Sequence, residues 1–230
     1  DVEILGSGAS IGVNAFADCG NLKNVKIPDS TKLNSSGVFL NDHIGLEITK
    51  DTGKVSENFG YKDRSKGIVS IVIDEGISAL GNNAFREMRE LTSVTIPGSV
   101  TNVGSNVLFG SAALSNVSLG DGMTEIGFRM FRGCTGLTNI AIPNTITSVG
   151  EYAFYGCKGL KSVDVTADYA KIGKYAFREC TNLEKANISG QYASIEAYAF
   201  YKCTGLTQVT YDTTAKVDST AFYGCSALKT

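Results

Sequence analysis

A short motif returns at an almost constant spacing along this chain, and that spacing limits what the chain can fold into. The motif reads I-G-x-x-A-F-x-x-C-x-x-L-x-x-V-x-I-P, and successive copies are 23 residues apart, with a last step of 22. The aliphatic residue that opens each copy stands at Leu80, Val103, Ile126, Val149, Ile172, Ile195 and Val217. A period of roughly 20–50 residues indicates a repeat array in which each copy is one structural unit.

Each copy carries an apolar face that it cannot bury by itself. The V-x-I part alternates apolar and polar residues, so both aliphatic side chains point to one face of a strand. The A-F, C and L positions approximate a helical stripe, which predicts a short helix before the strand. Stacked copies bury these faces against one another, so the sequence predicts an elongated α/β repeat solenoid.

The three prolines support this register. Pro28, Pro97 and Pro143 occupy the same position of the repeat, directly after the strand-like pair. Proline has no N–H to donate to a strand ladder, so it marks the point where pairing stops.

Residues 29–67 fit the repeat poorly, and two interpretations of them stay open. Ile11 and Leu80 are 69 residues apart, which is three periods of 23, so the segment has the length of decayed repeats. An inserted β-hairpin around residues 41–42 or 51–53 explains the irregularity equally well, because both sites favour tight turns. In either interpretation this segment is the irregular part of the surface.

The repeated unit resembles the BspA-like, or Treponema-pallidum-type, leucine-rich repeats, and the resemblance covers most of the chain. It implies a single leucine-rich repeat domain over residues 1–230. That domain would be a right-handed coil stack with parallel strands on the concave face and short helices on the convex face. The resemblance also implies a bacterial surface or secreted protein, a class in which some members act as adhesins for host proteins. The family has no shared catalytic residues to transfer.

The first residues carry no leader segment. The chain opens at Asp1 without a basic stretch followed by an apolar one, so it is either cytoplasmic or has lost a signal segment. The family resemblance favours the second, and we expect an extracellular or cell-surface location.

Composition and charge argue against several classes of function. The formal charge of −2 provides no basic footprint for nucleic acid, and no apolar run approaches the length of about 18 residues that a membrane-spanning helix needs. A serine or cysteine nucleophile usually needs a neighbouring base, and His43 is the only imidazole in the chain, which argues against most hydrolases. The stretch GSGASIG at residues 6–12 mimics a phosphate loop but lacks the helix of a βαβ unit. We therefore expect no enzyme activity and no cofactor.

The cysteines share one position of the repeat. Zinc sites use closely spaced cysteine pairs, which this sequence lacks. Equivalent side chains on stacked coils point the same way, which disfavours disulfides. Because cysteine fills a small apolar space well, we predict buried free thiols and no metal site for Cys19, Cys134, Cys157, Cys180, Cys203 and Cys225.

The outward face of the predicted strands carries a row of small polar residues. Such a row can hydrogen-bond an extended peptide or a glycan, although plain solvation of an exposed sheet explains it as well. The candidate ligand-binding residues on this face are Asn116, Ser118, Asn139, Ser162, Asp164, Lys185, Asn187, Gln208 and Thr210.

A second row, of tyrosines, is expected on the helical side. Tyrosine is enriched at binding surfaces, but its ring can equally cover the seam between two coils, which is the interpretation we favour. The candidates are Tyr152, Tyr155, Tyr175, Tyr198, Tyr201 and Tyr223. Tyr169 and Tyr192 align instead with the aliphatic residues Ile77, Val100 and Ile146, so we expect them in the core.

Together these patterns predict a non-catalytic, adhesin-like module of a bacterial cell-surface or secreted protein. Its partner would be a host extracellular protein or a glycan, with no nucleic acid and no membrane insertion. The alternative is a structural spacer, a repeat array within a larger surface protein.

Overall fold

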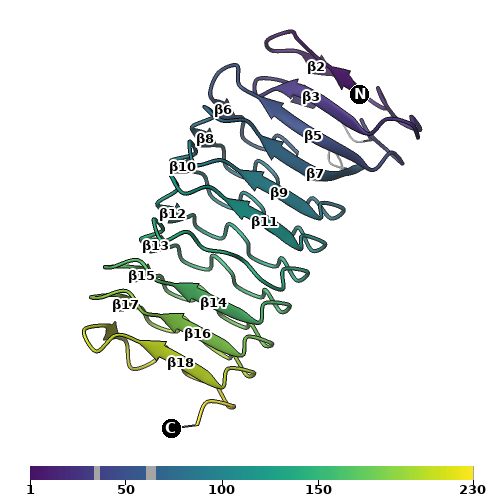
Figure 1. Ribbon diagram of the computed structural model, residues 1–230. Coiled ribbons are helices and arrows are strands. Elements are labelled where there is room, and N and C mark those ends of the chain that lie inside the picture. The colour runs from purple at the N-terminus through teal and green to yellow at the C-terminus, as the bar shows by residue number, and fades with distance from the viewer. Residues whose placement is uncertain (34–36, 61–65, 230) are drawn as a thin grey trace.

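The computed structural model describes residues 1–33, 37–60 and 66–229. They form an elongated stack of coils with the N-terminus at one end and the C-terminus at the other (Figure 1). A regular coil contributes a longer strand, a short strand and a series of turns, so the stack has three sides. The expected parallel-strand solenoid with a 23-residue period is confirmed.

The longer strands form the first side, whose outward surface we call the long-strand face. They are β1 (Val2–Glu3), β3 (Asn24–Pro28), β5 (Ile44–Thr49), β7 (Ile68–Ile73), β9 (Ser93–Ile96), β11 (Asn116–Leu119), β14 (Ser162–Val165), β16 (Lys185–Ile188) and β18 (Gln208–Tyr211). They pair in parallel as one sheet in the order β1-β3-β5-β7-β9-β11 and another in the order β14-β16-β18. Ser93 pairs with Asn116, one period away, so the register follows the repeat.

The short strands form the second side, the short-strand face. They are β2 (Ser10–Ile11), β4 (Lys32–Leu33), β6 (Lys54–Val55), β8 (Ala79–Leu80), β10 (Asn102–Val103), β12 (Glu125–Ile126), β13 (Ser148–Val149), β15 (Lys171–Ile172), β17 (Ser194–Ile195) and β19 (Lys216–Val217). Their sheets run in the orders β2-β4, β10-β8-β6 and β12-β13-β15-β17-β19. The aliphatic residue that opens each copy of the motif is the second residue of such a strand.

The third side, the turn side, contains no helix within the described residues, so the prediction of short convex helices is wrong. Tyr152 has a φ of 57° and Gly156 a φ of 71°, and the equivalent residues of neighbouring coils are also left-handed. A right-handed helix needs a negative φ at every residue. The A-F-x-x-C segment therefore folds as consecutive turns.

The backbone of the turn side alternates between two sets of hydrogen bonds. The N–H of Tyr155 donates to the carbonyl of Tyr152 in its own coil at 3.1 Å, and the N–H of Phe154 donates to the carbonyl of Ala176 in the next coil at 2.7 Å. An α-helix would use both N–H groups within itself. On the turn side, backbone hydrogen bonds between neighbouring coils thus take the place of the bonds that a helix would form within one coil.

In the copies that open at Leu80, Val103, Ile126, Val149 and Ile172, a glycine follows the aliphatic residue where neighbouring coils lie close together, whereas the last two copies carry Glu196 and Asp218 at this position. A Cβ on Gly150 would lie 2.9 Å from the carbonyl oxygen of Ile126, and one on Gly173 would lie 2.8 Å from that of Val149. A backbone oxygen cannot rotate away as a side chain can, so a larger residue would push two coils apart.

The interior is organised as rows of like residues. Phe131, Phe154, Phe177 and Phe200 are fully buried, as expected, and their ring centroids are 5.2, 5.0 and 5.0 Å apart. Parallel rings at this separation stack favourably. The core is therefore continuous from coil to coil along the stack.

The described residues of the segment 29–67 continue the stack with parallel strands. β5 pairs in parallel with β3 on one side and β7 on the other. The buried carboxylate of Asp29 accepts bonds from the N–H groups of Thr52 at 2.8 Å and Gly53 at 2.7 Å. The turn-prone residues 51–53 thus lie at a corner held by the preceding coil. Residues 34–36 and 61–65 of this segment are outside the described structure.

One copy departs from regular pairing. Residues 139–142 read N-I-A-I and fit the strand pattern, yet they form no strand and lie between β11 and β14 (Figure 1). Within the described chain, no N–H of these four residues bonds to the backbone of a neighbouring coil. Ile140 and Ile142 are only half-buried, whereas Val163 and Val165 at the equivalent positions are 1% exposed. The longer-strand ladder is therefore interrupted here.

Phe154→Ala is expected to destabilise the protein by about 3–5 kcal/mol, because it leaves a cavity inside the phenylalanine row. Tyr155→Ala, at a half-buried position of the turn side, is expected to cost about 1–2 kcal/mol through lost contacts with arginine side chains. Urea denaturation of both variants and the parent measures the difference. Equal losses would contradict the assignment of Phe154 to the core and Tyr155 to the surface.

Amide hydrogen exchange is expected to be faster at residues 139–142 than at Ser162–Val165, although the two segments have the same place in the repeat. The first lacks inter-coil backbone bonds and the second has them, and protection follows backbone hydrogen bonding. Exchange followed by mass spectrometry on the folded chain tests this. Equal protection would show that the ladder is continuous in solution.

Candidate functional site

Six of the polar residues expected to bind a ligand line one shallow groove on the long-strand face. The groove has a volume of about 340 Å³ and lies over β14, β16 and β18. We call it the polar groove. The parallel register sets its side chains in two rows across the strands: Ser162, Lys185 and Gln208 in one, and Asp164, Asn187 and Thr210 in the other.

The side chains of the polar groove are free to meet a ligand. Within the described residues, none of the six makes a side-chain hydrogen bond or an ion pair with the protein. They offer two amides, two hydroxyls, one carboxylate and one ammonium group, so donors and acceptors are both present. The charges of Asp164 and Lys185 cancel, which leaves the groove with no net charge.

The other three strand-face candidates lie outside this groove. Asn116 and Ser118 are exposed on β11, which belongs to the other longer-strand sheet. Asn139 is exposed in the unpaired segment 139–142 that separates β11 from β14. The interruption of the ladder therefore divides the polar row that the sequence shows as continuous.

The tyrosine candidates lie on the turn side and pack against one another. Tyr152, Tyr175 and Tyr198 are half-buried and stacked, with centroids 5.1 and 5.4 Å apart. Tyr201 and Tyr223 stack at 5.9 Å. The ring faces of this row are therefore largely occupied by other rings.

Arginine side chains cover the same row. The guanidinium carbon of Arg178 lies 5.3, 5.5 and 5.0 Å from the ring centres of Tyr155, Tyr175 and Tyr201. Arg132 lies 4.7 Å from the ring of Tyr155. Such cation–π contacts stabilise the seam between coils, which agrees with a packing role for this row.

Tyr169 and Tyr192 were expected in the core, and that prediction is wrong. The two residues are 70% and 53% exposed, and the residues that follow them, Ala170 and Ala193, are buried instead. The N–H of Tyr169 donates to Gln191 of the next coil at 2.7 Å, and its φ of 57° turns the side chain outward. The Tyr-Ala pair in both copies is the sequence signal that could have revealed this exchange.

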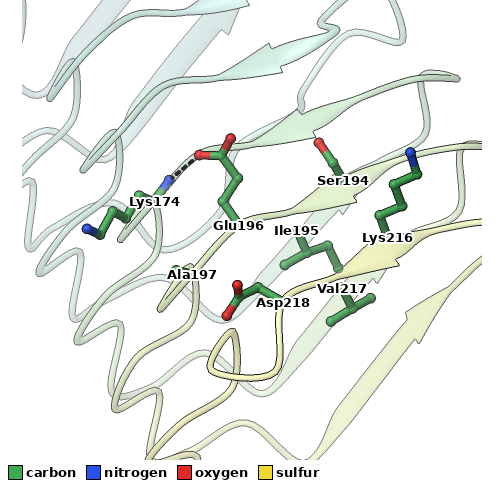
Figure 2. Close-up of a pocket in the computed structure, with 8 residues that line it drawn as sticks. All are labelled: Lys174, Ser194, Ile195, Glu196, Ala197, Lys216, Val217 and Asp218. Carbon is green, nitrogen blue, oxygen red and sulfur yellow. Dashed lines mark hydrogen bonds between the residues drawn. The ribbon is translucent and has the colours of Figure 1, made fainter.

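A second hollow, of about 480 Å³, lies on the short-strand face beside β17 and β19 (Figure 2). Glu196 accepts a bond from the N–H of Lys174 at 3.1 Å and pairs with Lys171 at 2.9 Å, a contact that raises the pKa of Lys171. Asp218 accepts a bond from the hydroxyl of Thr220 at 2.6 Å, which lowers the pKa of Asp218. Both carboxylates already accept bonds from protein groups, which does not suit a role in proton transfer to a ligand.

The glycine-rich stretch at residues 6–12 and His43 do not line the polar groove or the second hollow. Residues 6–12 include β2, which pairs in parallel with β4 as part of a coil. His43 is exposed in a left-handed turn conformation. Among the described residues, no three histidine, cysteine, aspartate or glutamate side chains are grouped to hold a metal ion.

The cysteines form a buried row beside the phenylalanines. The S–H of Cys157 donates to the carbonyl of Phe131 in the preceding coil at 3.0 Å, and the hydroxyl of Ser111 makes the same bond to Phe85 at 3.2 Å. All six cysteines are free, as predicted. Burial raises the pKa of Cys134 to about 12, so its thiol is inert at neutral pH.

Cys19 is the exception to the predicted burial. It is exposed, and its S–H points to the carbonyl of Ala17 in its own coil at 3.8 Å. The other five thiols donate to a carbonyl of the preceding coil, which is that of Leu108 for Cys134 and of a phenylalanine for the rest, and no earlier coil of the described structure supplies such a carbonyl to Cys19.

The repeat and its geometry agree with one known family. Residues 1–111 and 105–229 match the family described as BspA type Leucine rich repeat region (6 copies). The chain belongs to this family. Among curated proteins, none matches the chain.

Several solved structures are similar to the chain, and one of them has a TM-score above 0.5. The T. pallidum leucine-rich repeat protein is 23% identical, with a TM-score of 0.64, over 76% of this chain and 82% of that one. A leucine-rich repeat protein from Bacteroides ovatus is 22% identical, with a TM-score of 0.46, over 96% and 69%. A leucine-rich cell surface protein from Faecalibacterium prausnitzii is 18% identical, with a TM-score of 0.47, over 87% and 62%.

The similarity to the T. pallidum protein concerns the fold alone, since the identity is low. The family and these structures are leucine-rich repeat proteins by description. A search of the described residues for a helix long and apolar enough to cross a membrane finds none.

A thiol titration tests the cysteine row. In the folded protein one thiol, Cys19, is expected to react with an aromatic disulfide reagent near pH 8, because only the thiolate of an accessible cysteine attacks the reagent. All six are expected to react after unfolding. A Cys19→Ser variant is expected to show no fast reaction. Rapid reaction of several thiols in that folded variant would contradict the buried row.

Proposed function

We propose that this chain is a non-catalytic binding module of a bacterial cell-surface or secreted protein, which contacts a host extracellular protein or glycan through its long-strand face. The observation that carries the proposal is the polar groove. Its six side chains have no partners within the described protein, although side-chain polar groups elsewhere in the stack are commonly engaged. The surface or secreted location rests on the family resemblance.

A binding role suits the groove better than a catalytic role. It holds no histidine or cysteine, and within the described residues no hydroxyl of the groove is hydrogen-bonded to Asp164 or Lys185, so no side chain there is arranged as an activated nucleophile. The carboxylates of the other hollow are already bonded by protein donors. We therefore propose that the chain is not an enzyme.

A structural spacer is the second candidate. It is favoured by the phenylalanine and cysteine rows, which tie successive coils together through the interior. Such a stack holds its two ends at a set distance, which is what a spacer in a larger surface protein requires.

A binding array of extracellular-matrix proteins and glycans tests the proposal. The variant Asn187→Glu/Gln208→Glu places two more negative charges in the polar groove. We expect it to lose the binding of the parent by about tenfold or more, which corresponds to about 1.4 kcal/mol. The matched control, Ser93→Glu/Thr95→Glu, adds the same charge to β9 on the same face and is expected to bind normally.

Each alternative has its own result. Binding that both variants keep would place the site off the polar groove and contradict the proposal as stated. Complete absence of binding by the folded parent would favour the spacer. Thermal unfolding of each variant shows whether a loss of binding reflects a loss of fold.

A further inference from the structure

We propose that the polar groove and the exposed pair Tyr169 and Tyr192 together form a binding site for a neutral carbohydrate chain. In this site the groove side chains hydrogen-bond sugar hydroxyl groups, and the tyrosine pair packs against the C–H face of a sugar ring. The inference rests on the proposed binding function and specifies its ligand class and its aromatic component.

The tyrosine pair is the first observation. Coils that place Ile77, Val100 or Ile146 at this position bury the side chain completely. Two adjacent coils instead turn a tyrosine outward, and the two rings stack with centroids 5.2 Å apart. Exposing two large aromatic side chains side by side forgoes the stability that their burial would supply, and contiguous exposed apolar surface commonly marks a contact site.

The pair is held in place by the backbone. The N–H of Tyr192 donates to the hydroxyl of Thr214 in the next coil at 2.8 Å. The N–H of Gln191 donates to the carboxylate of Asp168 at 2.8 Å, and Gln191 in turn accepts the N–H of Tyr169. These bonds link three coils at the corner, so the rings are presented by an ordered framework and lose little freedom when a ligand binds.

The location of the pair is the second observation. β14 ends at Val165 and Tyr169 follows four residues later; β16 ends at Ile188 and Tyr192 follows four residues later. Four residues span at most about 13–14 Å. The turns after β14 and β16 lie at the edge of the long-strand face (Figure 1). The backbone of each tyrosine therefore lies within about 13–14 Å of the carboxyl end of a strand that carries Asp164 or Asn187 in the polar groove.

The free ring surface is unequal within the pair. Stacking covers one face of each ring, and the register of β13 and β15 places Ile146, a buried residue, in the coil on the other side of Tyr169. The outer face of Tyr169 is therefore not covered by an equivalent exposed side chain, and Tyr169, at 70% exposed, is the more exposed residue of the pair. Tyr169 is expected to make the main contact with a sugar ring.

The chemistry of the groove selects the ligand class. Sugar hydroxyls both donate and accept hydrogen bonds, and they match a groove with amides, hydroxyls, one carboxylate and one ammonium group. The groove has no net charge, which suits a neutral ligand better than an acidic one. It also lacks the buried apolar anchor on which protein partners usually depend. An aromatic surface beside shallow polar groups leaves room for a chain of more than one sugar ring.

A glycan array with neutral and acidic oligosaccharides is the first test, followed by calorimetric titration with the neutral cello-, manno- or galacto-oligosaccharide that gives the strongest signal. We expect binding among the neutral chains. Tyr169→Ala is expected to weaken it by tenfold or more, and Tyr169→Phe, which keeps the ring, to retain most of it. Asp164→Asn is expected to weaken it by removing a charged acceptor. Phe128→Ala, at a partly exposed aromatic residue of the turn side, is the control and is expected to bind as the parent does.

The outcomes separate this inference from the proposed function. If the parent binds an extracellular-matrix protein through Asn187 and Gln208 but binds no neutral glycan, the carbohydrate inference is wrong and the binding function stands. If a neutral glycan binds equally well to Tyr169→Ala, the aromatic part of the inference is wrong. If the folded parent binds neither class, both fail. Preference for acidic glycans would also overturn the inference, because it would require a positive site elsewhere.

Discussion

Backbone hydrogen bonds along the stacking axis are the interaction on which the rest of this structure depends. They join neighbouring coils through the longer strands, through the short strands and through the N–H groups of the turn side. Because these bonds hold each coil one period from the next, residues 23 positions apart in the sequence become neighbours in space, about 4.8 Å apart where strands pair. A position in the motif is therefore also a position on a row that runs along the molecule.

The interior rows follow from that constraint. The buried ring of Phe154 stacks against a phenylalanine ring in the coil on each side. The thiol of Cys180 donates a hydrogen bond to the backbone carbonyl of Phe154. The left-handed conformation of Tyr152 is unfavourable for a non-glycine residue, yet the N–H of this residue donates to the carbonyl of Lys174 in the following coil. The hydrogen bonds between coils thus offset the local backbone strain. Consecutive turns form in place of the helix that the spacing of the apolar residues predicted.

The outward rows follow from the same constraint and give the molecule its candidate site. Three successive copies place different polar residues on β14, β16 and β18, and the common register gathers them into one groove without net charge. Two of these copies also turn Tyr169 and Tyr192 out at the strand ends. A repeated framework with variable outward residues is well suited to binding, because exchanging a surface side chain leaves the axial bonds intact.

The sequence by itself determined the period, the parallel register, the family, the buried phenylalanine row and the free thiols, because all of these depend only on which residues recur at a fixed spacing. The tertiary structure decided the rest. The spacing of apolar residues in the sequence carries no information on the sign of the backbone angle φ. The left-handed conformation of Tyr152 could therefore not be distinguished from a helical one. The spacing does not report which of two adjacent residues enters the core; the bond from Tyr169 to Gln191 in the next coil put Ala170 inside and the tyrosine outside. Nor does it report whether a well-formed strand pattern is paired: residues 139–142 fit the motif, but strand pairing depends on backbone contacts with both neighbouring coils, and these form only in the assembled stack.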